Sequence, residues 1–280
     1  MKIIAKPLAG LANKLRVIES ALSLGRDLDC PVDVVWVPDW QMVARYDQLF
    51  EPTELFRVID QDKYRYGRSS FLMTGVKGQL SRLINKYYYG LDVVFNELDI
   101  RRQVRPGNWD IFSMVKDKVS YIDTCHNFYP YHYRFSWIRP ISSIRDAVDI
   151  VGGAIRNNNC IGLHIRRTDN ADSITHSPDH LFETAIREEI SKDPGVVFFL
   201  ATDDQRTQEH FVGLFGSDRI LVHQKKFGRD SIPAIQDAVV DWLLLSKCRK
   251  LYCSFFSSFS ETAAVVSDAP AITLKTLSEE

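Results

Sequence analysis

Residues 161–169 read Ile-Gly-Leu-His-Ile-Arg-Arg-Thr-Asp, and this stretch guides the interpretation of the rest of the chain. The apolar run from Cys160 to Ile165 predicts a short buried strand that ends on two adjacent arginines. Open α/β sheets bind ligands beyond the carboxyl ends of their strands, and the planar arginine fork fits a phosphate. Arg166 and Arg167 therefore indicate an anion site, most simply for a nucleotide diphosphate. Surface or interdomain salt bridges remain the alternative, because the chain has 36 acidic residues.

Length and composition are typical of a soluble globular enzyme. The 280 residues suit one large domain or two of about 100–150 residues each. The formal net charge of −1 gives no whole-chain attraction to nucleic acid or to an anionic membrane. We expect no signal peptide and no transmembrane segment, because no apolar run is long enough. Five scattered cysteines argue against a disulfide framework or a zinc site and favour the cytoplasm.

Strand and helix patterns alternate along the chain, most regularly after Pro140. Strands are predicted at residues 2–6, 32–37, 119–123, 160–166, 196–201, 219–222, 250–254 and 271–274. Helices are predicted at residues 11–28, 38–50, 80–89, 144–154, 181–190, 205–214, 233–246 and 259–267. This alternation predicts βαβ units with parallel sheets. We therefore expect an α/β protein of two Rossmann-like halves, 1–138 and 139–280, joined by an aromatic connector at 125–140.

Three predicted strand ends of the second half carry polar residues. They are His164 to Asp169, then Thr202 to Asp204, and finally Ser254 followed by Ser257 and Ser258 at the start of a helix. Hydroxyl groups and free N–H groups at a helix N-terminus bind phosphate. Asp203, Asp204 and the two serines are, alternatively, ordinary helix caps. Asp241 lies in an apolar run and needs a partner, either structural or from a ligand.

Together these motifs resemble those of the α-1,6-fucosyltransferase family, which includes nodulation-factor and core fucosyltransferases and is related to the protein O-fucosyltransferases. The order and spacing match over HIRRTD at 164–169, LATDD at 200–204 and DWLLLSKCRKLYCSFFSS at 241–258. A weaker similarity joins GLANKLR at 10–16 to the G-x-x-N-[RQ] opening of several fucosyltransferase families, although Lys14 departs from it. Residues 52–135 match no pattern that we can place.

The resemblance implies a GT-B architecture, in which two Rossmann-like halves with mostly parallel sheets face across a cleft. It implies that Arg166 holds the β-phosphate of GDP-fucose, that His164 and Asp241 meet the guanine, and that Ser257 or Ser258 meets the phosphates. The nucleotide-sugar-binding residues expected on this basis are His164, Arg166, Arg167, Asp203, Asp204, Asp241, Ser257 and Ser258. Such enzymes invert the anomeric centre without a metal, so we expect no metal site and no cofactor besides the donor. An arginine fork can stabilise the departing diphosphate instead.

Two positions depart from the active members of that family. Asn170 stands where a basic residue is usual, and Ile174 stands where a glutamate is usual. The acceptor base therefore stays open, with candidates Asp169, Asp172, Asp39 and Asp47. The catalytic residues we predict are Arg166, Asp169 and Asn13. Asn13 is expected to open the first helix and face the cleft, with a helix N-cap as the alternative role.

We therefore expect a free-standing, bacterial-type glycosyltransferase of the cytoplasm, inverting and metal-independent, that transfers fucose from GDP-fucose to a glycan acceptor. The N-terminal half would carry the acceptor, the C-terminal half the nucleotide sugar, and nucleic acid would not bind. The alternatives are another nucleotide-sugar donor, or a GDP-sugar- or glycan-binding protein that has lost catalysis. A nucleotide-fold oxidoreductase is disfavoured, because the chain lacks G-x-G-x-x-G in its first turn and lacks G-x-x-x-x-G-K-[ST] throughout.

Overall fold

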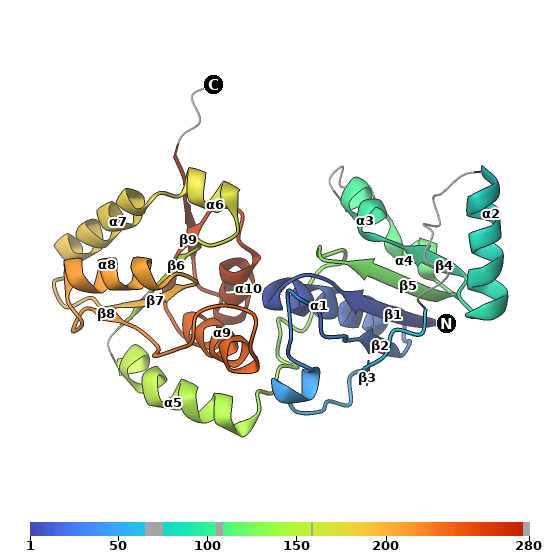
Figure 1. Ribbon diagram of the computed structural model, residues 1–280, viewed down its shortest axis with the longest axis horizontal. Coiled ribbons are helices and arrows are strands. Elements are labelled where there is room, and N and C mark those ends of the chain that lie inside the picture. Colours follow the sequence, from blue (N-terminus) through green and yellow to red (C-terminus); the bar gives the residue numbers. More distant parts are fainter. Residues whose placement is uncertain (65–74, 105–108, 158, 277–280) are drawn as a thin grey trace. The chain divides into compact units, whose positions relative to one another are not determined.

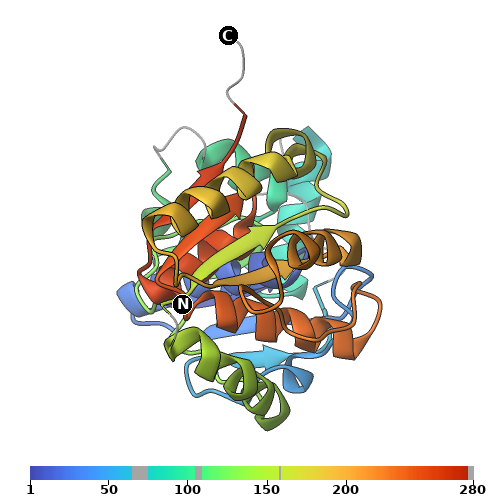
Figure 2. The same ribbon diagram turned by 90° about the vertical axis from the view of Figure 1, so that its left-hand side faces the viewer.

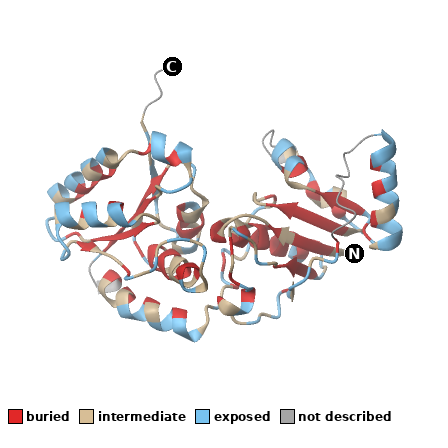
Figure 3. Cartoon of the chain, in the orientation of Figure 1, coloured by how far each residue is buried: buried red, intermediate tan, exposed pale blue. Residues whose placement is uncertain are grey.

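The computed structural model describes residues 1–64, 75–104, 109–157 and 159–276. The chain divides into two compact units, Met1–Arg139 and Pro140–Glu280. Each unit is built around a five-stranded sheet whose neighbouring strands all run parallel. The central strands of both sheets are buried (Figure 3). The expected α/β class is confirmed in both units.

The first unit has the strand order β3-β2-β1-β5-β4. Its elements are β1 (Lys2–Pro7), α1 (Leu11–Asp27), β2 (Val32–Val35), the 3-10 turn η1 (Tyr46–Gln48), β3 (Arg57–Ile59), α2 (Gly75–Leu83), the π-helical segment η2 (Ile84–Tyr88), β4 (Val93–Phe95), α3 (Glu97–Val104), α4 (Ile111–Val115) and β5 (Val119–Thr124). Helix α1 packs against β1 and β2 (Figure 1). β5 is the last strand in sequence but lies between β1 and β4.

The helix predicted at 38–50 is wrong. The Asp39 carboxylate accepts hydrogen bonds from the backbone N–H groups of Gln41, at 2.8 Å, and Met42, at 3.0 Å. Such a local turn competes with helix formation, and only η1 is helical in this stretch. Trp40, predicted on the apolar face, is 83% exposed. The helix predicted at 80–89 exists, but it begins at Gly75 and becomes π-helical after Leu83.

A buried carboxylate anchors the aromatic connector. Glu19 on α1 has no exposed surface. Its Oε1 accepts hydrogen bonds from the N–H groups of Tyr133, at 2.8 Å, and Arg134, at 3.0 Å. Its Oε2 accepts from the Phe135 N–H at 3.0 Å and from Trp137 Nε1 at 2.8 Å. The burial of this charge is therefore offset by hydrogen bonds that fix the end of the first unit on α1.

The second unit has the strand order β10-β9-β6-β7-β8. Its elements are α5 (Ser142–Asn157), β6 (Ile161–Ile165), α6 (Ala171–His176), α7 (Asp179–Lys192), β7 (Phe198–Thr202), α8 (Gln205–Phe215), β8 (Ile220–Leu221), α9 (Ile232–Leu245), β9 (Lys250–Ser254), α10 (Ser258–Ser267) and β10 (Ala271–Leu274). In both views, β6 and β7 lie between α7 on one side and α5 on the other (Figures 1 and 2). Apart from α6, each of these elements was predicted within a few residues of its ends.

Strand β6 can lie close to its neighbours because it carries Gly162. A Cβ atom at this position would lie 2.4 Å from the Leu251 side chain on β9 and 3.0 Å from the Leu245 side chain on α9. Both approaches are shorter than a normal carbon contact, so a larger side chain would require the Leu251 and Leu245 side chains to move. The glycine therefore helps to hold the strand whose end carries Arg166.

Each sheet has a topological switch point. The chain leaves β6 toward β7, whereas β9 pairs with the other side of β6. In the first unit, the chain leaves β1 toward β2, and β5 pairs with the other side of β1. Ligands of open α/β sheets bind beyond the carboxyl ends of the strands at such points. The loops after β6 and β9, and after β1 and β5, are therefore the places to look for sites.

Candidate functional site

The ends of β6 and β9 are tied together by a serine hydroxyl. The backbone N–H of Arg166 donates to Ser254 Oγ at 3.0 Å, and that hydroxyl donates to the carbonyl oxygen of His164 at 3.2 Å. Two of the motifs recognised in the sequence thus meet at the switch point of the second sheet. Arg166 begins the loop after β6, and its side chain is only 17% exposed.

The Arg166 guanidinium lies between two carboxylates. It forms ion pairs with Asp169 and, from Nη1 at 3.0 Å, with Asp203. Asp169 has a side chain that is 52% exposed and also pairs with Arg229 at 2.8 Å. Asp203 is more buried, and its Oδ1 accepts the Arg167 N–H at 2.7 Å. The fork is therefore preorganised from its buried side, while its exposed side is held by a carboxylate at the surface.

Asp203 is kept ionised by this environment. Burial alone would raise the pKa of Asp203, but the Arg166 charge and the hydrogen bonds from Thr168 and from the Arg167 N–H lower it below its ordinary value. A carboxylate that is already paired with a guanidinium and with backbone donors is a poor free ligand for a cation. Its role in this structure is to orient Arg166.

Arg167 and Asp204 have structural partners. Arg167 pairs with Asp179 and donates to the carbonyl oxygens of Ser177 and Arg166, each at 2.8 Å. These contacts agree with the salt-bridge alternative for this second arginine, and its contact with the nucleotide sugar stays a prediction. Asp204 accepts the Thr207 N–H at 2.8 Å and caps the N-terminus of α8.

His164 lies under the site as a buried, neutral ring. It is 4% exposed and stacks on Phe259, with ring centroids 5.0 Å apart and planes at 23°. Burial and the nearby Arg166 charge lower the pKa of His164 well below its ordinary value. Its Nδ1 has no hydrogen-bond partner among the described residues. An unsatisfied buried polar atom is costly, so this nitrogen is a candidate to meet a ligand.

Asp241 has a partner that the sequence patterns did not reveal. It forms an ion pair with Lys225, and both side chains are almost fully buried, at 6% and 5% exposure. Burial raises the pKa of Asp241, and the Lys225 charge opposes this rise. Oδ1 of Asp241 has no partner within the described part of the chain. His223 pairs with Asp237 at 3.0 Å beside this group.

The basic residues missed by sequence reasoning come from one loop between β8 and α9. His223, Lys225 and Arg229 lie in it, and each contacts an acidic residue of the site or its surroundings. The signal was available, because residues 223–229 read HQKKFGR directly after a predicted strand end. No family pattern marked this loop, and its contacts become visible only when the strand order is known.

The start of α10 supplies hydroxyls and backbone N–H groups. Ser257 is the N-cap residue, yet its side chain makes no capping hydrogen bond, and Ser258 begins the helix. Both residues are half-buried. The capping alternative therefore does not account for the Ser257 hydroxyl, and this helix end offers partial positive charge to an anion.

The two departures from the family pattern are the N-cap residue of α6 and a residue within that helix. Asn170 caps this helix by accepting the Ser173 N–H at 3.1 Å, and its amide donates to the Phe256 carbonyl at 3.0 Å. A basic residue would not make this pair of contacts. Ile174 is 41% exposed on the same helix, and Asp172 is exposed beside it.

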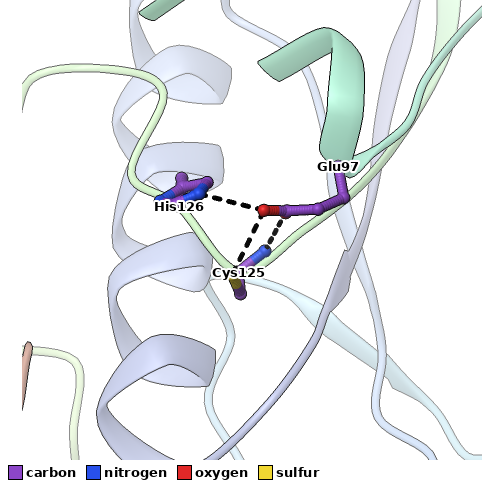
Figure 4. Close-up of side chains that lie close together, drawn as sticks. All are labelled: Glu97, Cys125 and His126. Carbon is purple, nitrogen blue, oxygen red and sulfur yellow. Dashed lines mark hydrogen bonds and ion pairs between the residues drawn. The ribbon is translucent and has the colours of Figure 1, made fainter. Parts of the chain in front are cut away.

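A second polar cluster lies at the switch point of the first unit (Figure 4). Glu97 lies at the start of α3. Its Oε1 pairs with His126 Nε2 at 2.9 Å, and its Oε2 accepts a hydrogen bond from the Cys125 N–H at 2.8 Å. Thr124 Oγ1 also donates to Oε2, at 2.6 Å. On the other side, Arg16 donates to the Cys125 carbonyl at 2.7 Å and lies 3.5 Å from His126 Nδ1. No sequence motif marked these residues as a site.

Glu97 is held as a carboxylate and Cys125 as a thiol. The hydrogen bonds from His126, Thr124 and Cys125 outweigh the effect of burial and lower the pKa of Glu97 to about 2. Burial and the Glu97 charge raise the pKa of Cys125 to about 11. A half-buried imidazole oriented by a carboxylate is an arrangement used in proton transfer.

The same three residues are the described group whose donor atoms lie close enough together to share a cation. Glutamate, thiolate and imidazole suit Zn²⁺. A metal on His126 Nε2 would, however, require the proton on Nδ1, where it would face the Arg16 guanidinium, itself a donor. The hydrogen-bonded network therefore fits these residues better than a metal site does.

Asn13 is the third residue of α1, and Gly10 is the N-cap residue. The N-cap alternative for Asn13 is therefore wrong.

Two of the candidates for the acceptor base lie in the first unit. The Asp39 carboxylate already accepts hydrogen bonds within its own turn and lies 3.6 Å from the Lys14 ammonium group. Asp47 is exposed and paired with Arg45.

Solved fucosyltransferase structures are similar to this chain. It matches NodZ alpha-1,6-fucosyltransferase co-crystallised with GDP at a TM-score of 0.65 and 20% identity, covering 97% of this chain and 94% of that one. It matches a variant of Arabidopsis thaliana FUT1 in complex with GDP at 0.61 and 12%, covering 96% and 69%. It matches POFUT1 in complex with GDP-fucose at 0.57 and 11%, covering 98% of both chains. No protein-family model matches this chain, and no curated protein matches it significantly.

The chain has the GT-B fold. The two parallel sheets, each with its own helices, are the two Rossmann-like halves that the sequence motifs led us to expect. The resemblance to fucosyltransferases is confirmed for the fold, with a match that covers 97% of the chain and so extends beyond the motifs that carried it in the sequence. At this level of identity the likeness establishes architecture, and activity has to be argued from the site.

Proposed function

We propose that this protein is a glycosyltransferase that uses a GDP-sugar, and specifically that it transfers fucose from GDP-fucose to a glycan acceptor with inversion and without a metal. The observation that carries the proposal is Arg166, held by Asp203 and tied to Ser254 at the switch point of the second sheet. Similar structures contain GDP or GDP-fucose, which supports the choice of donor.

The diphosphate would take the place that Asp169 now occupies on Arg166. Asp169 is the more exposed of the two carboxylates on this guanidinium and has Arg229 as a second partner. Exchange of Asp169 for a phosphate would leave the Asp203 contact intact. The arginine fork, with the Ser257 and Ser258 end of α10 beside the same strand ends, would then stabilise negative charge as the sugar–phosphate bond breaks.

The guanine would be recognised by two buried side chains of the second unit, each of which has a polar atom without a hydrogen-bond partner. Asp241 keeps Oδ1 without a partner, and His164 keeps Nδ1 without one, among the described residues. A carboxylate oxygen accepts from the amino and ring N–H donors of guanine, and a neutral histidine nitrogen can accept or donate. Lys225 would hold Asp241 in place and balance its charge.

The first unit would bind the acceptor, and His126 is our candidate for the group that accepts its proton. Glu97 orients the ring through Nε2, and the side chain is 31% exposed. Nδ1 would carry the lone pair, and the acceptor hydroxyl would have to take the place of the Arg16 guanidinium, which lies 3.5 Å from Nδ1. Positioned general bases contribute roughly 10²- to 10⁴-fold to rate. His126→Asn should therefore lower kcat at least ~10²-fold with little change in the binding of GDP. Unchanged kcat in this variant would show that His126 is not the base and would favour a candidate in the second unit.

The free thiols of the five cysteines support a reducing compartment, and we propose the cytoplasm of a bacterium as the site of action.

Thermal unfolding with nucleotides tests the donor site first. GDP and GDP-fucose should raise the melting temperature, whereas UDP and ADP should not, since a ligand at ~100 times its Kd stabilises the native state by about 2.7 kcal/mol. Release of GDP from GDP-fucose, with transfer to a glycan mixture, then distinguishes an enzyme from a binding protein. An equal shift with UDP would remove the guanine assignment, and binding without any GDP release would favour the non-catalytic alternative.

A further inference from the structure

Helix α2 and the following segment η2 present an apolar face to solvent. Val76, Leu80, Leu83 and Tyr87 are 82%, 58%, 53% and 78% exposed. They follow one another at intervals of four, three and four residues, which places them on one side of a helix. Figure 3 shows α2 exposed along most of its surface. We refer to these four side chains as the apolar face of α2.

The opposite side of the same helix is small and polar, and this is the side that is buried. Its buried residues are Gly78, Ser81 and Asn85, again at intervals of three and four. A helix on the surface of a globular protein normally turns its apolar stripe toward the core. Here the orientation is reversed, so the apolar face of α2 is available to bind something outside its own unit.

The surrounding charge identifies the chemistry of the partner. Lys77, Arg82 and Lys86 are exposed along the same helix. The sequence from residue 63 to residue 91 contains six basic residues and no acidic one, although the whole chain has a net charge of −1. Helices with leucine or aromatic residues on one face and basic residues beside it lie in the interface of anionic membranes. Tyrosine, with an apolar ring and a polar tip, suits the same depth.

A second copy of this chain is a poorer partner. Two copies that paired through the apolar face of α2 would bring their Lys77, Arg82 and Lys86 side chains together, and like charges across an interface oppose association. An anionic lipid surface instead offers opposite charge to the basic residues and hydrocarbon to the apolar ones.

We propose that α2 and η2 form a docking surface for a lipid bilayer that contains anionic lipids. Val76, Leu80, Leu83 and Tyr87 enter the boundary between headgroups and acyl chains, and the basic residues meet the headgroups. The helix lies along the surface of the bilayer. Within residues 1–64, 75–104, 109–157 and 159–276, no helix has the length and apolar character needed to cross a membrane.

Vesicle flotation with the full-length protein tests this proposal. The protein should float with vesicles of phosphatidylglycerol and phosphatidylcholine and stay behind with phosphatidylcholine alone. High salt should weaken the binding, because it screens the basic residues. The double variant Leu80→Ser/Leu83→Ser and the double variant Lys77→Gln/Lys86→Gln should each lower the bound fraction at least ~10-fold.

The matched control removes two exposed apolar side chains from the second unit. Ile150 and Leu214 are 81% and 42% exposed, and Ile150→Ser/Leu214→Ser should float as the wild type does. Circular dichroism and melting temperature confirm that each variant is folded. Failure of the wild type to float, or undiminished flotation of Leu80→Ser/Leu83→Ser, would overturn the proposal. A concentration-dependent dimer in light scattering that Leu83→Ser dissolves would overturn it in favour of a second copy.

Discussion

Arg166 and Asp203 form an ion pair of 3.0 Å at the end of two neighbouring parallel strands, and this contact leaves the other edge of the guanidinium to the exposed Asp169. An arginine oriented from behind by a buried carboxylate loses little freedom when it binds an anion. This geometry makes the fork, and not the charge alone, the feature on which the proposed chemistry depends.

Arg166→Lys tests that dependence. Lysine keeps the positive charge but cannot contact Asp203 and a phosphate with a planar fork, so kcat/KM should fall at least ~10²-fold, as on loss of one preorganised donor. Arg167→Lys is the control: it breaks contacts to Asp179 and to the Ser177 carbonyl. That variant should lower the melting temperature more and kcat/KM less. Near-normal turnover of Arg166→Lys would show that this arginine is structural.

Chelation separates the arginine mechanism from a metal mechanism. Activity should survive dialysis against EDTA, because the charge facing the leaving diphosphate comes from Arg166. Loss of turnover that Mg²⁺ or Mn²⁺ restores would point instead to Asp203 and Asp204 as ligands. Loss that only Zn²⁺ restores would assign the metal to Glu97, Cys125 and His126, the described group with suitably close donor atoms.

Asn13→Asp separates a contact with ligand from a local role in the helix. Asn13 lies in the first turn of α1, which has no acidic residue, so aspartate should be neutral or slightly stabilising there. If the amide donates to sugar or acceptor, turnover should drop at least ~10-fold, equivalent to about 1.4 kcal/mol in the transition state. Unaltered kinetics with a normal melting temperature would remove Asn13 from the catalytic residues.

Ionised Glu97 should contribute to the free energy of unfolding at neutral pH and contribute less as the pH falls. Its pKa in the folded protein is about 2, below the ordinary value of 4.5. A carboxylate with a depressed pKa contributes stability that is present above its unfolded value and is lost as the pH falls toward its folded value. The difference in unfolding free energy between wild type and Glu97→Gln should therefore be largest near neutral pH and smaller at about pH 3. Urea titrations at both pH values measure it; a difference that grows on acidification contradicts the assignment.

Glu19→Gln should destabilise the protein although it changes no exposed surface. The carboxylate accepts from three backbone N–H groups and from Trp137 Nε1. An amide offers one acceptor oxygen and turns an NH₂ group toward donors, which should cost at least about 2 kcal/mol. Glu54→Gln at an exposed position is the control, with an expected change within about 0.5 kcal/mol. Equal denaturation midpoints for the two variants would show that the connector is held by other contacts.

The second unit was largely predictable from sequence, and the reason is the length of its patterns. Strands such as β6 and β9 are continuous apolar runs, and helices α7, α8 and α9 show a helical apolar period. Their polar ends could be predicted to meet because parallel strands place their carboxyl ends at one edge of the sheet. The Arg166–Ser254 contact is an instance of that rule.

The first unit resisted prediction for local and for tertiary reasons. β3 and β4 are three residues each, too short for an alternating pattern to stand out. The predicted helix after Pro38 is replaced by a turn, because the Asp39 side chain accepts a hydrogen bond from the Gln41 N–H. The contact between Glu97 and His126 depends on β4 lying beside β5, which no local pattern encodes. The ion pair between Lys225 and Asp241 likewise depends on the path of the loop before α9, which no local pattern encodes.

The position of β5 has a consequence for synthesis on the ribosome. Residues 119–124 are the last strand of the first unit to be made, yet they fill the middle of its sheet, with β1 on one side and β4 on the other. Until they emerge, β1 presents an open strand edge and β4 has no strand to pair with. A nascent chain released before residue 119 therefore lacks the strand that covers one edge of β1 and one edge of β4, which makes it prone to aggregate.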